Sequence, residues 1–79
     1  MLLKIYNLEG EIFSGEVVSI SSQTATGEIT ILDYHRPLIT VLKTGQIKII
    51  KPDQEKIEVA VSGGFLEVRP GNRVSVIIK

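Results

Sequence analysis

The feature that most limits what this chain can fold into is its share of side chains branched at Cβ. Ile, Val and Thr supply 12, 8 and 5 of its 79 residues, whereas Ala supplies two. Branching at Cβ restricts χ1 and suits the pleated surface of a strand better than a helix. No stretch longer than one turn repeats apolar residues at the spacing of a helical face. The sequence therefore predicts an all-β fold.

Alternation of apolar and polar residues indicates where the strands lie. It is clearest over residues 27–31, 46–49, 56–61 and 73–78, where every second side chain is apolar. This period of two is typical of a strand with one buried face. Turn-forming residues separate the runs at intervals of about 8–12 residues, as in sandwiches and barrels. We expect a flattened β-sandwich or barrel of about eight to ten short, mostly antiparallel strands.

Two runs are apolar on both of their faces. Leu38–Leu42 is interrupted only by Thr40, and Val17–Ile20 only by Ser19. A strand of this kind lies between two layers, or its outer face is covered by a partner. Because a chain of 79 residues has little material for another layer, burial within the domain and burial by a partner are given equal weight.

Length and charge exclude several classes of protein. A chain of this length forms one domain, residues 1–79. Nine basic and nine acidic side chains give no net charge, and no basic cluster suited to nucleic acid is present. With no Cys and a single His, an ordinary structural zinc site is excluded, and no calcium-loop spacing occurs. No apolar run approaches the ~20 residues of a membrane-spanning helix. We predict no metal, no cofactor and no nucleic-acid partner.

Chemically reactive groups are sparse. Asp33 and His35 could act as an orienting acid and a base for a serine from elsewhere. No serine stands in a nucleophile elbow, so we favour a polar turn between strands. The run Ser62–Phe65 contains two glycines but lacks the lysine of a phosphate-binding loop. It is interpreted as a bend where glycine allows close backbone approach. We therefore predict no catalytic residue.

The order of turns and strands resembles the N-terminal domain of the epsilon subunit of rotary proton-translocating ATP synthases. The most specific match is Ser62-Gly63-Gly64-Phe65-Leu66-Glu67-Val68. The other matching segments are residues 13–17, 27–29, 35–40, 42–45 and 70–76.

The resemblance implies a noncatalytic subunit of the central rotor stalk. Such a subunit binds the gamma subunit and the proteolipid ring of the membrane sector, and so couples proton transport to ATP synthesis. It is a peripheral membrane protein on the cytoplasmic face of a bacterial inner membrane, or its organellar equivalent, and contacts the membrane only through the complex. The alternative is a stand-alone small β-barrel that binds a ligand or single-stranded nucleic acid.

Residues that match the family pattern are assigned to two partners. Those expected in loops that face the ring are Glu28, His35, Arg36 and Lys43. Those expected to face gamma are Asn7 and Thr40. Members of the family commonly continue into a helical hairpin after the last strand. This sequence ends at Lys79, and we expect the hairpin to be absent from it.

Overall fold

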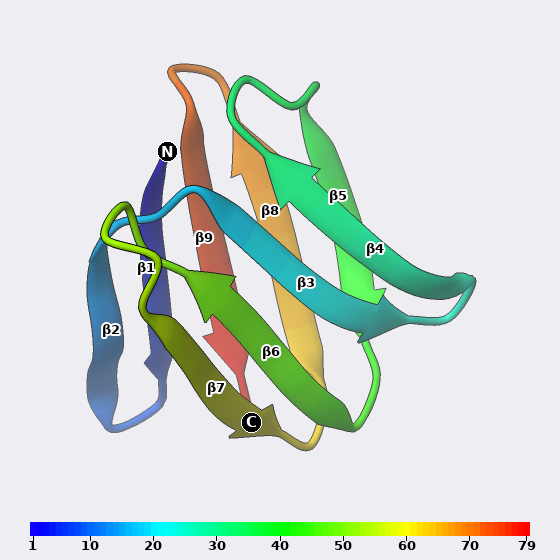
Figure 1. The fold of residues 1–79 in the computed structure, drawn as a ribbon. Helices are drawn as coiled ribbons and strands as arrows, with labels where there is room; N and C mark the ends of the chain where they lie inside the picture. Colours follow the sequence, from blue (N-terminus) through cyan, green and yellow to red (C-terminus); the bar gives the residue numbers. More distant parts are fainter.

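The computed structural model describes residues 1–79 and consists of nine strands joined by short turns (Figure 1). It has no helix that could cross a membrane. The strands are β1 (Leu2–Asn7), β2 (Gly10–Glu16), β3 (Ser19–Thr24), β4 (Gly27–Leu32), β5 (Leu38–Leu42), β6 (Gly45–Ile50), β7 (Lys56–Val61), β8 (Gly64–Arg69) and β9 (Arg73–Ile78).

One continuous sheet is folded over into two layers. Its strands follow the order β2-β1-β9-β8-β5-β3-β6-β7, and β4 pairs with β3. β3 and β5 meet only where Thr24 pairs with Leu42, so the sheet turns over at that narrow joint. The five-stranded layer is β2-β1-β9-β8-β5, and the four-stranded layer β4-β3-β6-β7 crosses in front of it in Figure 1. All pairs are antiparallel except β1 and β9, which run in parallel.

The hydrophobic core lies between the two layers. Fifteen buried apolar side chains form one cluster. In β9, Val74, Val76 and Ile78 are buried while the intervening residues are not, as the alternation of a strand requires. Leu66 of β8 and Ile5 of β1 are fully buried. Burying one such side chain contributes about 1.5–3 kcal/mol to folding.

Most expectations about the fold are confirmed. The chain is all-β, and its nine strands lie within the expected number. The four alternating runs correspond to β4, β6, β7 and β9. The expectation for Val17–Ile20 is wrong, because Val17 and Val18 precede β3 and only Ser19 and Ile20 belong to it. Val17 is apolar because it packs in the core, where its N–H donates to the Met1 carbonyl at 2.9 Å.

The run Leu38–Leu42 forms β5, and nothing in the chain covers its outer face. Ile39 is 71% exposed and Val41 54%. Burial within the domain is therefore wrong for this strand, and burial by a partner stays a prediction.

The glycine pair after β7 carries the chain from one layer to the other. Gly64 has φ +150°, and a Cβ added there would lie 2.1 Å from the carbonyl oxygen of Ile77 and 2.9 Å from the Cα of Ile78. Both atoms belong to the backbone of the neighbouring strand β9. The predicted close backbone approach is confirmed.

Candidate functional site

Apolar side chains form a row across the outer face of the five-stranded layer. Pairing of the strands sets Tyr6 of β1 opposite Ile77 of β9, Ile77 opposite Phe65 of β8, and Phe65 opposite Val41 of β5. Ile77, Phe65 and Val41 are 46%, 55% and 54% exposed, and Tyr6 is half-buried. We call these four residues the apolar row. Ile39 extends it along β5.

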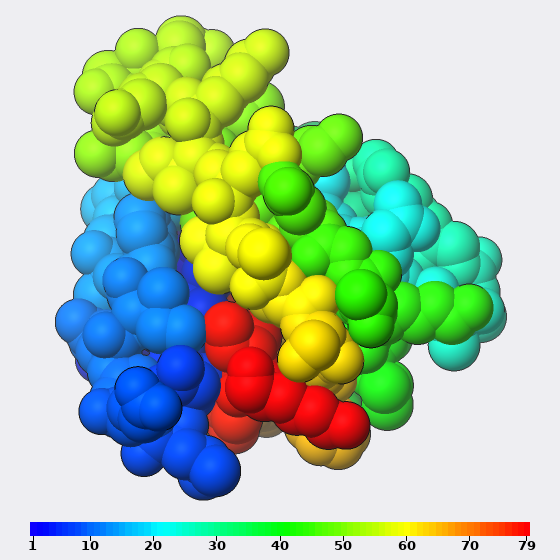
Figure 2. Space-filling model, turned by 90° about the horizontal axis from the view of Figure 1, so that it is seen from below, coloured from blue at the N-terminus to red at the C-terminus, as the bar shows by residue number.

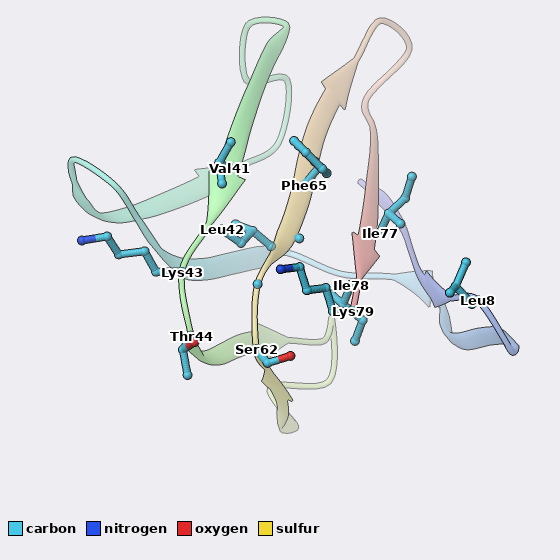
Figure 3. A pocket seen from close by; sticks show the side chains of 12 residues that line it. Leu8, Val41, Leu42, Lys43, Thr44, Ser62, Phe65, Ile77, Ile78 and Lys79 are labelled. Atoms are coloured by element: carbon cyan, nitrogen blue, oxygen red, sulfur yellow. The ribbon is translucent and has the colours of Figure 1, made fainter.

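Most of the apolar row lines an open groove of about 600 Å³. Val41, Phe65 and Ile77 line it together with the turn residue Leu8, which is fully exposed (Figure 3). Seen from below, the end of β9 lies between the hairpin of β1 and β2 and the beginning of β8 (Figure 2). The charged residues that line the groove are Lys43 and Lys79.

The middle row of the opposite outer face, on the four-stranded layer, is polar. Register places Thr30, Ser21, Lys48 and Glu58 side by side on β4, β3, β6 and β7. The hydroxyl oxygens of Ser21 and Thr30 are 3.0 Å apart and share a hydrogen bond. Lys48 stands opposite Glu58, a favourable cross-strand pair. A neighbouring row of this face holds the apolar residues Leu32 and Ile50, but Ser19 lies between them. An uninterrupted apolar row therefore occurs only on the five-stranded layer.

Two of the predicted ring-facing residues lie at one end of β4. The Lys43 N–H donates to the Gln23 carbonyl at 2.9 Å, and the Gln23 side-chain amide donates to Glu28 Oε1 at 3.1 Å. Gln23 thus links the connection between β5 and β6 to the turn between β3 and β4. Glu28 and Lys43 are both exposed.

The other two predicted ring-facing residues, His35 and Arg36, lie at the far end of β4. They follow Leu32, whose carbonyl accepts the His35 N–H at 3.3 Å, and both are exposed. The six residues of β4 span roughly 20 Å at about 3.3 Å per residue. The structure therefore divides the four residues into two pairs at opposite ends of a strand.

The predicted gamma-facing residues occupy different environments. Asn7 ends β1, is half-buried and accepts the Glu9 N–H on its Oδ1 at 2.8 Å. Thr40 is half-buried and paired with Leu66, on the core side of β5. The strongly exposed neighbours on that strand are Ile39 and Val41.

The sequence reasoning did not identify Phe65 and Ile77 as surface residues. A signal was present, because each has a buried apolar neighbour, Leu66 and Ile78. Two consecutive apolar residues in a strand point to opposite faces, so one of each pair had to lie outside the core.

Asp33 holds together the end of the molecule at which His35 lies. Its Oδ1 accepts hydrogen bonds from the Met1 amino group at 2.6 Å and from the Asn72 side-chain amide at 3.2 Å. Asn72 Oδ1 in turn accepts the Tyr34 N–H at 2.7 Å. His35 Nδ1 lies 2.7 Å from the Arg36 carbonyl oxygen instead. The hypothetical acid–base pair of Asp33 and His35 is therefore not formed, and no three His, Asp or Glu side chains gather as metal ligands.

We expect Asp33→Asn to make the free energy of unfolding depend less on pH in the acid range. The hydrogen bond from the Met1 amino group, and then that from Asn72, lowers the pKa of Asp33 below its ordinary value of 3.8. A carboxyl whose pKa is lower in the folded chain contributes stability above its unfolded pKa, and loses it as the pH falls through the folded pKa. The native chain should therefore lose more stability than Asp33→Asn between about pH 5 and pH 2. Urea unfolding midpoints measured across that range test this.

A second variant separates the two donors to Asp33. Asn72 has φ +58°, which Gly tolerates without strain, so Asn72→Gly removes its side chain and keeps the turn. It should flatten the profile less than Asp33→Asn does. Identical acid profiles for the native chain and Asp33→Asn would contradict the assignment.

The chain is similar to known proteins along its whole length. The family described as ATP synthase, Delta/Epsilon chain, beta-sandwich domain matches residues 1–79. A protein of Dichelobacter nodosus (strain VCS1703A) named ATP synthase epsilon chain is 50% identical over 58 residues, 73% of this chain and 41% of that protein. A protein of the same name from Stenotrophomonas maltophilia (strain K279a) is 42% identical over 66 residues, 84% of this chain and 47% of that protein. The matched residues make up less than half the length of these relatives.

Two solved structures share the fold. A chain of the Euglena gracilis mitochondrial ATP synthase, OSCP/F1/c-ring in rotational state 1, superposes with a TM-score of 0.93 at 24% identity, over 99% of this chain and 49% of that one. A chain of the Tetrahymena thermophila mitochondrial ATP synthase, central stalk/c-ring, gives 0.83 at 17%, over 99% and 62%. At these identities the likeness concerns the fold alone.

Proposed function

The chain belongs to the delta/epsilon β-sandwich family of ATP synthase, and from that membership we propose that it is a noncatalytic subunit of the central stalk. In this role it binds the gamma subunit and the proteolipid ring, and so couples proton transport to ATP synthesis. The observation that carries the proposal is the family match over residues 1–79. The names of its relatives, ATP synthase epsilon chain, support it.

The proposed contact with the ring uses Glu28, His35, Arg36 and Lys43. Because these lie at the two ends of β4, a contact that includes them all extends along that strand for roughly 20 Å. An interface of standard size buries about 800 Å² per partner, which corresponds to a patch roughly 30 Å across. One such interface is wide enough to reach both pairs.

The proposed contact with gamma includes Asn7 and Thr40. Asn7 immediately precedes Leu8, which lines the groove, so a partner at Asn7 is close to exposed apolar surface. Thr40 is only half-buried on the core side of β5, so part of this residue remains accessible to a partner. The polar residues of an interface set its register, whereas its buried apolar centre supplies most of the affinity.

The proposed location follows from this assembly. The chain would lie on the cytoplasmic face of a bacterial inner membrane, or on the equivalent organellar face, and would meet the membrane only through the complex.

We expect charge reversal at Glu28 or Lys43 to impair coupling without unfolding the chain. Both side chains are exposed, and exposed substitutions of this kind change stability by about 0.5 kcal/mol or less. Glu28→Lys and Lys43→Glu should reduce ATP-driven proton pumping several-fold in membranes that carry the whole complex. The thermal midpoint of the isolated chain should stay within about 4 °C of the native value.

Lys56→Glu is the matched control, because Lys56 is exposed on β7, away from β4. It should leave pumping unchanged. Normal pumping in both test variants would refute the ring contact, whereas failure of the native chain to co-purify with gamma would refute the stalk assignment itself.

A further inference from the structure

We propose that a small concavity at one end of the five-stranded layer binds a phosphate group, supplied either by a soluble phosphate compound or by a lipid headgroup. The concavity lies beside the turn between β8 and β9, at the top of Figure 1. Its volume is about 130 Å³, which at roughly 30 Å³ per water molecule leaves room for one phosphate group. The polar side chains that line it are Lys4, Arg69, Arg73 and Ser75, and no Asp or Glu does so. We call these four residues the basic concavity.

Strand register gathers the three cations on one face. Arg69 of β8 stands directly opposite Arg73 of β9. Lys4 of β1 stands opposite Ser75, the next residue of β9 on that face, so Lys4 is a diagonal neighbour of Arg73 within reach of a long side chain. Like charges directly opposite each other destabilise a sheet. An anion bound between Arg69 and Arg73 therefore offsets an unfavourable pair.

No carboxylate of the chain pairs with these cations. The three ion pairs of the structure involve the Met1 amino group and Lys51 instead. The carboxylates that share rows with the cations are Glu16 and Glu67. Glu16 lies 3.5 Å from the Met1 nitrogen, and Glu67 is half-buried and does not line the concavity. The basic concavity therefore has a positive charge that the fold does not balance.

One of the three cations is already held in place. Arg73 Nε–H donates a hydrogen bond to the Pro70 carbonyl at 3.1 Å, so the guanidinium is folded back over its own turn. This bond leaves the terminal N–H groups of Arg73 available to a ligand. An arginine whose orientation is fixed before binding loses less conformational freedom when it binds an anion.

The donors of the basic concavity favour phosphate over carboxylate. A phosphate group offers three acceptor oxygens and up to two negative charges, which match cations on three different strands. Ser75 adds a hydroxyl on β9, between β1 and β8. A carboxylate has one charge and two oxygens, and a single arginine can occupy both of them. It therefore gains less from the remaining donors.

A second concavity, on the four-stranded layer, is a poorer candidate. Lys48 and Lys56 line it, but so does Glu58, which stands directly opposite Lys48. Opposite charges form a favourable cross-strand pair, so this concavity has less positive charge to offer a phosphate. Lys48 is therefore a suitable control residue.

Titration with inorganic phosphate tests the proposal on the 79-residue chain. The amide signals of residues 69–75 in ¹⁵N-labelled protein should shift and saturate, with a dissociation constant on the order of 1 mM. Acetate at equal ionic strength should bind at least about tenfold more weakly. Shifts that are equal for the two anions would show general screening and would refute the proposal.

Charge-neutral variants locate the site. Arg69→Gln and Arg73→Gln should each weaken phosphate binding about fivefold, the effect of one hydrogen bond to a charged group. Lys48→Gln should leave it unchanged. Glu67→Gln removes a neighbouring carboxylate and should strengthen binding. Retained dispersion of the amide spectrum shows that each variant is folded.

Lipid vesicles distinguish the two sources of the phosphate group. Co-sedimentation with phosphatidylcholine vesicles that contain phosphatidic acid, lost in Arg73→Gln, assigns the phosphate to a lipid headgroup. Saturable binding of inorganic phosphate without co-sedimentation assigns it to a soluble compound. The proposal fails if neither probe gives binding that depends on Arg73, or if Lys48→Gln weakens binding as much as Arg73→Gln.

Discussion

Replacement of Gly64 with Ala is expected to lower the free energy of unfolding by at least about 3 kcal/mol. The added Cβ would meet the Ile77 carbonyl oxygen at 2.1 Å and the Ile78 Cα at 2.9 Å. Both are backbone atoms of a strand hydrogen-bonded on two sides, so neither can swing away as a side chain does. Relief of the overlap requires β8 and β9 to separate, which breaks the pairing that buries Leu66 and Val76.

Gly10→Ala is the matched control for this prediction. Gly10 also has a positive φ, +135°, but a Cβ there meets nothing within 4 Å. Its substitution costs only the backbone strain, about 1–3 kcal/mol. The two variants, compared by urea denaturation, therefore separate strain from steric overlap. Equal losses of stability in the two would show that the approach of β9 to Gly64 does not matter.

Truncation of two adjacent residues on β8 should change the free energy of unfolding by very different amounts. Leu66→Ala removes a side chain with no exposed surface and should cost about 2–5 kcal/mol, from lost burial and from the cavity left behind. A domain of this size has a total stability of roughly 4–12 kcal/mol, so this loss is a large part of the total. The two chains are therefore compared at temperatures where the variant is still folded. Thermal unfolding should show a fall of about 4–8 °C for each kcal/mol lost.

Phe65→Ala, one residue away, should leave the isolated chain close to native stability. Phe65 is 55% exposed, and truncation there removes only a part of the contacts that a core residue makes. If its effect on unfolding equals that of Leu66→Ala, then Phe65 belongs to the core of the free chain, and the apolar row is not a free surface.

Local pattern was sufficient to predict the segments that form β4, β5, β6, β7 and β9, but not how the strands meet. Period-two alternation in residues 73–78 correctly predicts that Val74, Val76 and Ile78 face the core, because side-chain direction in a strand depends only on the parity of position. The joint between Thr24 and Leu42, which folds the sheet into two layers, pairs residues from different parts of the chain. No repeat within a short window encodes such a pairing.

Local sequence pattern could not predict the candidate site either, for the same reason. Tyr6, Val41, Phe65 and Ile77 come from four strands, and only register brings them into one row. The family pattern placed Glu28 and His35 in loops of the same region, but β4 lies between them and holds them at its two ends. An extended strand advances about 3.3 Å per residue. Two residues that are close in sequence therefore lie far apart in space when a strand separates them.

The parallel pairing of the first and last strands has a mechanical consequence. Leu2 pairs with Arg73 and Tyr6 with Ile77, so the beginning of β1 and the end of β9 lie at opposite ends of one ladder. Tension that pulls these two ends apart acts along the strands and loads all the hydrogen bonds of the ladder simultaneously. It cannot open them one after another, as it would in a hairpin pulled from its open end. The domain thus resists stretching between the beginning of β1 and the end of β9.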